Sequence, residues 1–226
     1  MFCCLAWPTS ARAQARSAST AASVLALRQA IFEAEDRRAP TEADVRTLQD
    51  GSRHPDETVQ RMAVRALGRP ERAALVGSIE PALDSRFASV RAVAADAIGQ
   101  AVASADGDAA LAVQASLRKR LAVERDPAVI GAVCRMLGRL PYSVPQAIRT
   151  AEVTLLVAAL PLDSDAGRFL PLRLGLARGF EALIRRNAQV FTPSAETVRR
   201  MKQLTLDRIT PRRGEGAVRV VAGAPL

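Results

Sequence analysis

Histidine, lysine and aromatic residues are scarce in this chain. His54 is the only histidine, and the 226 residues include one Trp, one Tyr and six Phe. A single histidine excludes metal sites built from two or more histidines, and no cysteine–histidine cluster accompanies it. Alanine, leucine and valine therefore dominate the 49% of apolar residues, a composition that favours closely packed helices.

Long apolar runs are also missing. The longest, 153–162, has ten residues and contains Pro161, whereas a helix that spans a bilayer needs about 20. The sequence therefore predicts no transmembrane segment.

The first residues, MFCCLAWPTSARAQ, contain a short apolar piece and the small residues Ala11 and Ala13 ahead of Gln14. This A-x-A spacing is similar to a signal-peptidase site. We interpret 1–23 as a signal-peptide remnant and linker, which predicts export to the periplasm or outside a bacterial cell. The alternative is a disordered N-terminus on a cytoplasmic protein. Without this segment only Cys134 remains of the three cysteines, so no internal disulfide can form.

The net charge of +9 is concentrated near the C-terminus. Nine basic and three acidic residues follow residue 184, so this part carries six of the nine positive charges. The 32 basic residues comprise two lysines and 30 arginines. This excess of arginine over lysine is expected either from a GC-rich genome or from phosphate recognition. Basicity by itself indicates attraction to anions and does not identify a fold.

One pattern occurs three times. Segments 57–68 (ETVQRMAVRALG), 88–99 (ASVRAVAADAIG) and 127–138 (PAVIGAVCRMLG) each place a valine nine residues before a glycine. Their apolar residues recur at i, i+3, i+4, i+7 and i+8, which predicts helices with one buried face. We expect Asp56 and Asp126 to cap two of these helices. We expect Gly68, Gly99 and Gly138 to end all three in the left-handed conformation.

Further helices are predicted between and around the three copies. Thr41 with Asp44 has the form of a capping box for one of them. The predicted ranges are 24–38, 42–51, 72–83, 108–123, 145–160, 169–186 and 193–209, with 153–160 and 169–186 as a degenerate last pair and 210–226 as an irregular, truncated tail.

The repeated unit resembles a HEAT repeat of the bacterial kind related to the phycobilin-lyase repeats. The resemblance depends on the following residues of the three copies: Asp56, Val59, Ala63, Leu67 and Gly68; Val90, Arg91, Ala94, Ile98 and Gly99; Asp126, Pro127, Val129, Val133, Leu137 and Gly138. It departs from the family where Phe87 replaces the capping acid and where Gln60 and Ile130 replace an arginine. It implies an all-α fold, a right-handed α–α superhelix of about four to five helical hairpins over 24–209, with a concave binding surface.

Segment 28–36 (RQAIFEAED), followed by such repeats, is also similar to the N-terminal half of exported bacterial proteins that join HEAT repeats to a cyclophilin-type peptidyl-prolyl isomerase domain. That resemblance implies that the chain is a scaffold fragment of a longer isomerase, without the isomerase site.

No catalytic constellation, cofactor motif or metal site is predicted. His54 is expected to be a solvated turn residue and Cys134 a small packing residue. Four arginines of the repeated helices, Arg61, Arg65, Arg91 and Arg135, form a candidate ladder for an acidic protein or peptide, interrupted by Asp96. Ion pairs within and between repeats are the alternative interpretation of these arginines.

A second candidate surface is basic and lies near the C-terminus, at Arg199, Arg200 and Lys202, which would suit nucleic acid. The sequence thus predicts a non-catalytic scaffold that mediates protein–protein interaction. A fragment of an isomerase and a HEAT-like nucleic-acid-binding protein are the alternatives.

Overall fold

The computed structural model describes residues 9–37, 39–105, 107–160 and 169–206, with side chains from residue 22 onward. This part of the chain is all helical, with ten α-helices and two short 3₁₀ helices, η1 and η2. The elements are α1 (Thr9–Asp36), α2 (Glu42–Gly51), α3 (Glu57–Gly68), η1 (Ala73–Leu75), α4 (Val76–Ile79), η2 (Glu80–Asp84), α5 (Ala88–Ala101), α6 (Gly107–Val123), α7 (Pro127–Leu137), α8 (Pro145–Ala158), α9 (Leu170–Arg186) and α10 (Ala195–Leu206).

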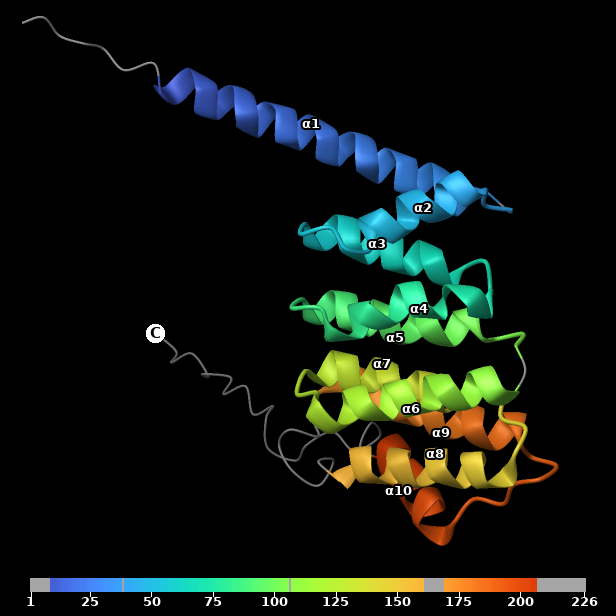
Figure 1. The fold of residues 1–226 in the computed structure, drawn as a ribbon. Coiled ribbons are helices and arrows are strands. Elements are labelled where there is room, and N and C mark those ends of the chain that lie inside the picture. The colour runs from blue at the N-terminus through green and yellow to red at the C-terminus, as the bar shows by residue number, and fades with distance from the viewer. Residues whose placement is uncertain (1–8, 38, 106, 161–168, 207–226) are drawn as a thin grey trace, which may run out of the picture.

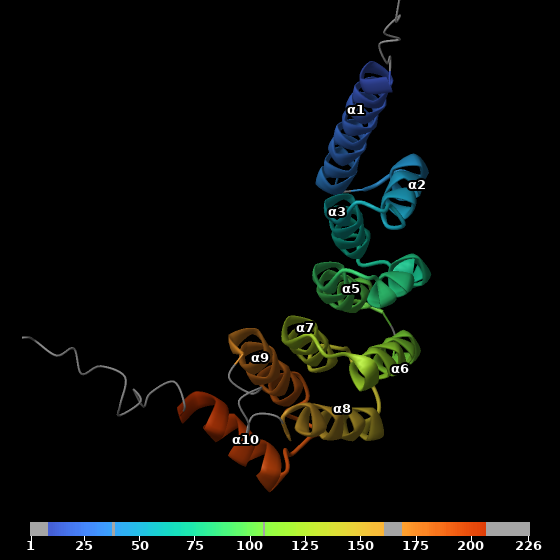
Figure 2. The same cartoon turned by 90° about the vertical axis from the view of Figure 1, so that its left-hand side faces the viewer.

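The helices follow one another down the molecule in chain order (Figure 1). Seen from the side, α3, α5, α7 and α9 form one row, and α2, α4, α6 and α8 form a second row beside it, to the right (Figure 2). Successive members of the first row pack on each other, and α10 packs on α8 and α9. The stack bends toward the first row, which we therefore call the inner row (Figure 2). No described helix combines the length and the hydropathy that crossing a bilayer would require.

The buried faces of the three repeated helices are confirmed. Three positions are fully buried in each copy. They are the valine, the small or branched residue four positions after it and the residue eight positions after it. Burial of one such side chain contributes about 1.5–3 kcal/mol for the larger residues, so the stripe of each copy adds several kcal/mol to the packing of the core. The residues are Val59, Ala63 and Leu67 in α3, Val90, Ala94 and Ile98 in α5, and Val129, Val133 and Leu137 in α7.

The predicted helix starts are confirmed at three positions. The carboxylate of Asp56 accepts from the backbone N–H of Val59 at 2.9 Å, and that of Asp126 accepts from two backbone N–H groups at the start of α7. Thr41 and Asp44 form the complete capping box of α2. By contrast, Phe87 precedes α5 and supplies no side-chain cap. Each cap satisfies a backbone donor that the helix itself leaves unpaired.

The helix ends expected at Gly68 and Gly138 are confirmed, but the end expected at Gly99 and the left-handed backbone expected at all three glycines are wrong. None has the left-handed backbone: Gly68 is the last residue of α3, α5 continues past Gly99 to Ala101, and Gly138 has φ −71°. Instead they lie where inner-row helices approach closely. A Cβ on Gly68 would stand 2.7 Å from the Cα of Ala97 in α5, and one on Gly138 would overlap the carbonyl of Gly179 in α9. The glycine is required by packing between helices and not by a turn.

The segment predicted as one helix over 72–83 is broken into η1, α4 and η2. Pro81 lies inside it and has no N–H to donate to the carbonyl of Gly77, so a continuous α-helix cannot pass this point. The broken segment still buries Ile79 and Leu83 against the core.

The ends of the chain differ from expectation as well. α1 begins at Thr9, so residues 14–23, predicted to be a linker, are helical and continuous with the helix expected from 24. The helix predicted from 193 begins at Ala195 as α10, and the hydroxyl of Ser194 accepts from the N–H of Thr197 at 3.2 Å and caps it. Residues 1–8 and the predicted tail 210–226 lie outside the described residues.

Candidate functional site

Arg65 of α3 and Arg69, the residue that follows α3, meet a buried carboxylate of α1. Arg65 donates from Nε and Nη2 to the two oxygens of Glu35, at 3.0 and 2.7 Å, and Arg69 donates from Nη1 at 3.2 Å. The Glu35 side chain is only 5% exposed, whereas those of Arg65 and Arg69 are 56% and 62% exposed. The carboxylate thus holds both guanidinium groups in place while leaving N–H donors on each of them directed to solvent.

Arg61 extends this pair into a row. Arg61, Arg65 and Arg69 are spaced by four residues, so they share one face of α3, opposite the buried residues Ala63 and Leu67. Within the described part of the chain Arg61 has no ion pair, and Glu35 is the only acid that pairs with the other two. We call these three residues the arginine row.

A hollow of about 330 Å³ opens beside the arginine row. Its lining comes from α1, α3 and α5: Glu35, Arg65, Gly68, Arg69, Glu71 and Gln100. Glu71 has φ 52°, the only non-glycine residue with positive φ in the described chain, and its carboxylate accepts from the hydroxyl of Ser104 at 3.0 Å. The backbone N–H of Glu71 donates to the carbonyl of Gly68 at 3.2 Å, so this left-handed residue closes the turn at the end of α3.

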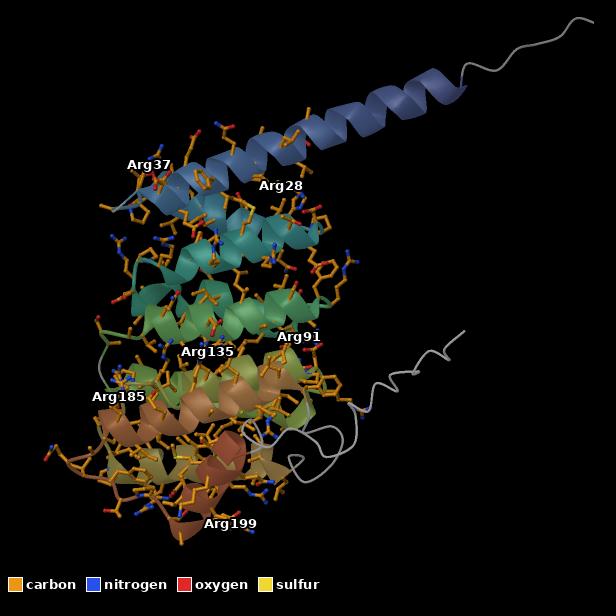
Figure 3. All side chains as sticks on the ribbon, turned by 180° about the vertical axis from the view of Figure 1, so that it is seen from behind. Arg28, Arg37, Arg91, Arg135, Arg185 and Arg199 are labelled. Carbon is orange, nitrogen blue, oxygen red and sulfur yellow. The ribbon has the colours of Figure 1, made fainter. Side chains whose placement is uncertain are left out.

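Arg91, another predicted ladder residue, lies elsewhere. In the alignment of the copies it corresponds to Gln60, one position before the first residue of the arginine row. Arg91, labelled in Figure 3, donates to both oxygens of Glu124 at 2.7 and 3.0 Å. Burial alone would raise the pKa of Glu124. The hydrogen bonds from Arg91 and from the backbone N–H groups of Asp126 and Arg125 outweigh it and lower the pKa to about 2. Arg91 therefore belongs to an internal network that joins α5 to the start of α7.

Arg135 of α7 pairs with Asp96 of α5, with two contacts of 2.6 Å between Nη2 and the carboxylate oxygens (Figure 3). Asp96, expected to interrupt the ladder, occupies the repeat position of Arg65 and is the partner of Arg135. Three of the four predicted ladder residues are thus in ion pairs between helices, as the alternative interpretation described, and the four do not form one row.

The basic residues of α10 are also engaged. Arg199 and Arg200 both donate to Glu196, and Arg200 is only 5% exposed. Lys202 is exposed and has no ion pair among the described residues (Figure 3 shows Arg199 on this helix). The expected patch therefore presents fewer accessible charges than its sequence indicates.

His54 and Cys134 serve the fold. His54 Nδ1 accepts from the backbone N–H of Asp56 at 3.1 Å, just before the start of α3. Cys134 is fully buried, as expected for a packing residue, and burial raises the pKa of its thiol to about 12. In the part of the chain that the structure describes, no group of three His, Cys, Asp or Glu side chains is arranged to hold a metal ion.

Sequence reasoning found Arg61 and Arg65 but missed Arg69 and Glu35. Arg69 comes after Gly68, the last residue of the repeated pattern, so the comparison of the three copies did not include it. Its spacing of four residues from Arg65 could have indicated that the two share a helix face. Glu35 lies 30 residues before Arg65, and only the packing of α1 on α3 brings the two together.

Comparison of the chain with protein-family models, with curated proteins and with solved structures gave no match. The described architecture, an all-helical protein with packing between neighbouring helices, therefore stands on its own geometry, and no family is identified.

Proposed function

We propose that this chain is a non-catalytic scaffold, a HEAT-type solenoid with right-handed superhelical stacking, that binds an acidic segment of a partner protein at its inner row. The observation that carries the proposal is the arginine row. Arg65 and Arg69 are oriented by Glu35, remain more than half exposed and flank a hollow of about 330 Å³.

Physical reasons favour a carboxylate-rich partner. A guanidinium group presents N–H donors in a planar fork that matches a carboxylate, and prior orientation by Glu35 reduces the conformational entropy lost on binding. Arg61 adds a charge that no described acid neutralises. An extended acidic segment lying along α3 would reach all three arginines in turn.

Binding of a fluorescein-labelled, glutamate-rich peptide to the full chain tests the proposal. The double variant Arg61→Glu, Arg69→Glu should weaken binding at least tenfold. Arg46→Glu with Lys119→Glu changes the net charge equally on exposed positions of α2 and α6, in the second row, and should change affinity less than twofold. Equal losses in both double variants would show that the peptide responds only to overall charge and would overturn the proposal.

Duplex DNA of the same charge serves as a second probe. Preferential binding of DNA, with a steep decrease on adding salt and insensitivity to the arginine row, would instead favour the nucleic-acid hypothesis. An isomerase domain in a longer protein and export from the cell stay predictions from the sequence.

A further inference from the structure

A second surface of different chemistry lies between α6 and α8. Residues of three helices line a groove of about 430 Å³: Arg118, Leu121 and Ala122 of α6, Ile130 of α7, and Val153, Thr154, Val157 and Ala158 of α8. Six of these eight residues are apolar. The hydroxyl of Thr154 donates to the carbonyl of Thr150 at 2.7 Å, so the groove's own polar side chain already has a partner within α8. We call this the apolar groove.

The apolar side chains of this groove are unusually exposed. Val153 and Val157 are 57% and 60% exposed, and Val123 and Leu160, near the ends of the same two helices, are 65% and 60% exposed. Of the groove lining, Leu121, Ile130 and Ala158 are partly buried against the core, and Val153 and Val157 stay exposed. Large apolar side chains left exposed beside a groove suit a surface that another molecule covers. The groove is lined by residues of α6, α7 and α8, and none of them lines the hollow beside the arginine row, so the two surfaces are separate.

The spacing of the lining residues matches a helix. Val153 and Val157 are four residues apart on α8, and Arg118 is three and four residues from Leu121 and Ala122 on α6, so each helix contributes one ridge. A third helix can insert its own apolar residues, spaced by three and four, between two such ridges. This is the geometry by which an amphipathic helix binds a groove.

The charge of the groove selects the partner. Arg118 is the only charged residue that lines it, it is exposed, and it has no hydrogen bond or ion pair among the described residues. No acid lines the groove. A partner with an acidic residue beside its apolar stripe would pair with Arg118, whereas a basic partner would be repelled. We propose that the apolar groove docks an amphipathic helix of a partner protein that carries an acidic residue next to its apolar stripe.

The probe is a labelled 14-residue helical peptide with leucines at positions spaced by three and four and glutamates beside them. A peptide of the same composition with scrambled spacing and a peptide with lysine in place of glutamate are the comparisons. Binding is measured on the full chain carrying Arg61→Glu and Arg69→Glu, so that the arginine row, of which only Arg65 is left, binds acidic peptides at least tenfold more weakly. The groove and the proposed function can then fail separately.

The glutamate helix should bind at least tenfold more tightly than the scrambled peptide. Val157→Glu should remove most of this binding, whereas Val190→Glu, an equally exposed valine far from the groove in sequence, should change it less than twofold. Arg118→Glu should weaken the glutamate helix and strengthen the lysine helix. This reversal identifies a charge contact, which general unfolding of the variant would not produce.

Three results would overturn the proposal. The first is equal affinity for the helical and the scrambled peptide. The second is a concentration-dependent dimer in sedimentation that Val157→Glu abolishes, since a second copy of the chain would then occupy the groove. The third is binding of dodecanoate in the groove with no binding of the helix, which would assign the surface to a small amphipathic ligand.

Discussion

At the scale of single residues, charged side chains pair with partners about one helix pair away in the chain. These contacts join elements that stack on each other, so they add polar links to the apolar packing between those elements. The sequence predicted the caps, because a cap lies within four residues of its donor. It offered ion pairs between repeats as one interpretation of the arginines, but it could not name their partners, because only the packing of distant helices brings them together. The pairs are Arg28 with Asp56, Glu35 with Arg65, Arg91 with Glu124 and Asp96 with Arg135.

Glu124 gives the clearest dependence on pH. Its pKa is lowered from 4.5 to about 2 in the folded chain, so its contribution to stability is complete above pH 4.5 and is lost as the pH falls toward 2. The shift corresponds to about 3 kcal/mol. We expect Glu124→Gln to lower the free energy of unfolding by this order at pH 7, and by progressively less at pH 4 and pH 3. Urea denaturation at each pH measures the difference.

Glu181→Gln is the matched control, because Glu181 forms an exposed pair with Arg185 and should contribute less than about 1 kcal/mol. A Glu124→Gln penalty that is the same at pH 3 and pH 7 would contradict the role assigned to the carboxylate.

At the scale of elements, helix periodicity was sufficient to place most of the helices, because each buries one face and that face repeats every three to four residues. Periodicity gave the wrong result at Pro81, where the missing N–H of proline interrupts the helix. It also missed the start of α1, because the small and polar residues there have no apolar periodicity. The roles of the glycines were also missed. A glycine after a periodic run is commonly a helix end, and the sequence does not reveal how closely the next helix approaches.

The close contact between α7 and α9 leads to a prediction. A Cβ on Gly179 would overlap the backbone carbonyl of Cys134, which cannot move without disturbing α7. We expect Gly179→Ala to destabilise the chain by about 1–3 kcal/mol, the usual cost of overpacking a core. Chemical denaturation measures the change.

Gly77→Ala is the control for that substitution, because no heavy atom lies within 4 Å of the added Cβ. This variant should be neutral or gain up to about 1 kcal/mol, since alanine favours the helix more than glycine does. The packing explanation would be wrong if both variants changed stability by the same amount.

At the scale of the whole molecule, the order of the elements and the two rows of helices are the features that create binding surfaces. The inner row exposes the arginine row on α3, and the second row exposes the apolar groove between α6 and α8. The repeated pattern predicted a stack of helices and singled out Arg61 and Arg65, but it did not reveal Arg69 and Glu35 beside them or the apolar groove. The surfaces depend on the residues that differ between the copies: Arg61 corresponds to Ala92 in α5, and Arg65 corresponds to Asp96.

Chemical-shift mapping tests most directly whether the arginine row is the binding face. On adding the glutamate-rich peptide to the isotopically labelled full chain, backbone amide shifts should change in α3 and in the residues that line the adjacent hollow, including Glu71 and Gln100. Amides of α10 should stay unchanged. Shifts confined to α10, or distributed over all exposed arginines without preference for α3, would contradict the proposed role of the inner row.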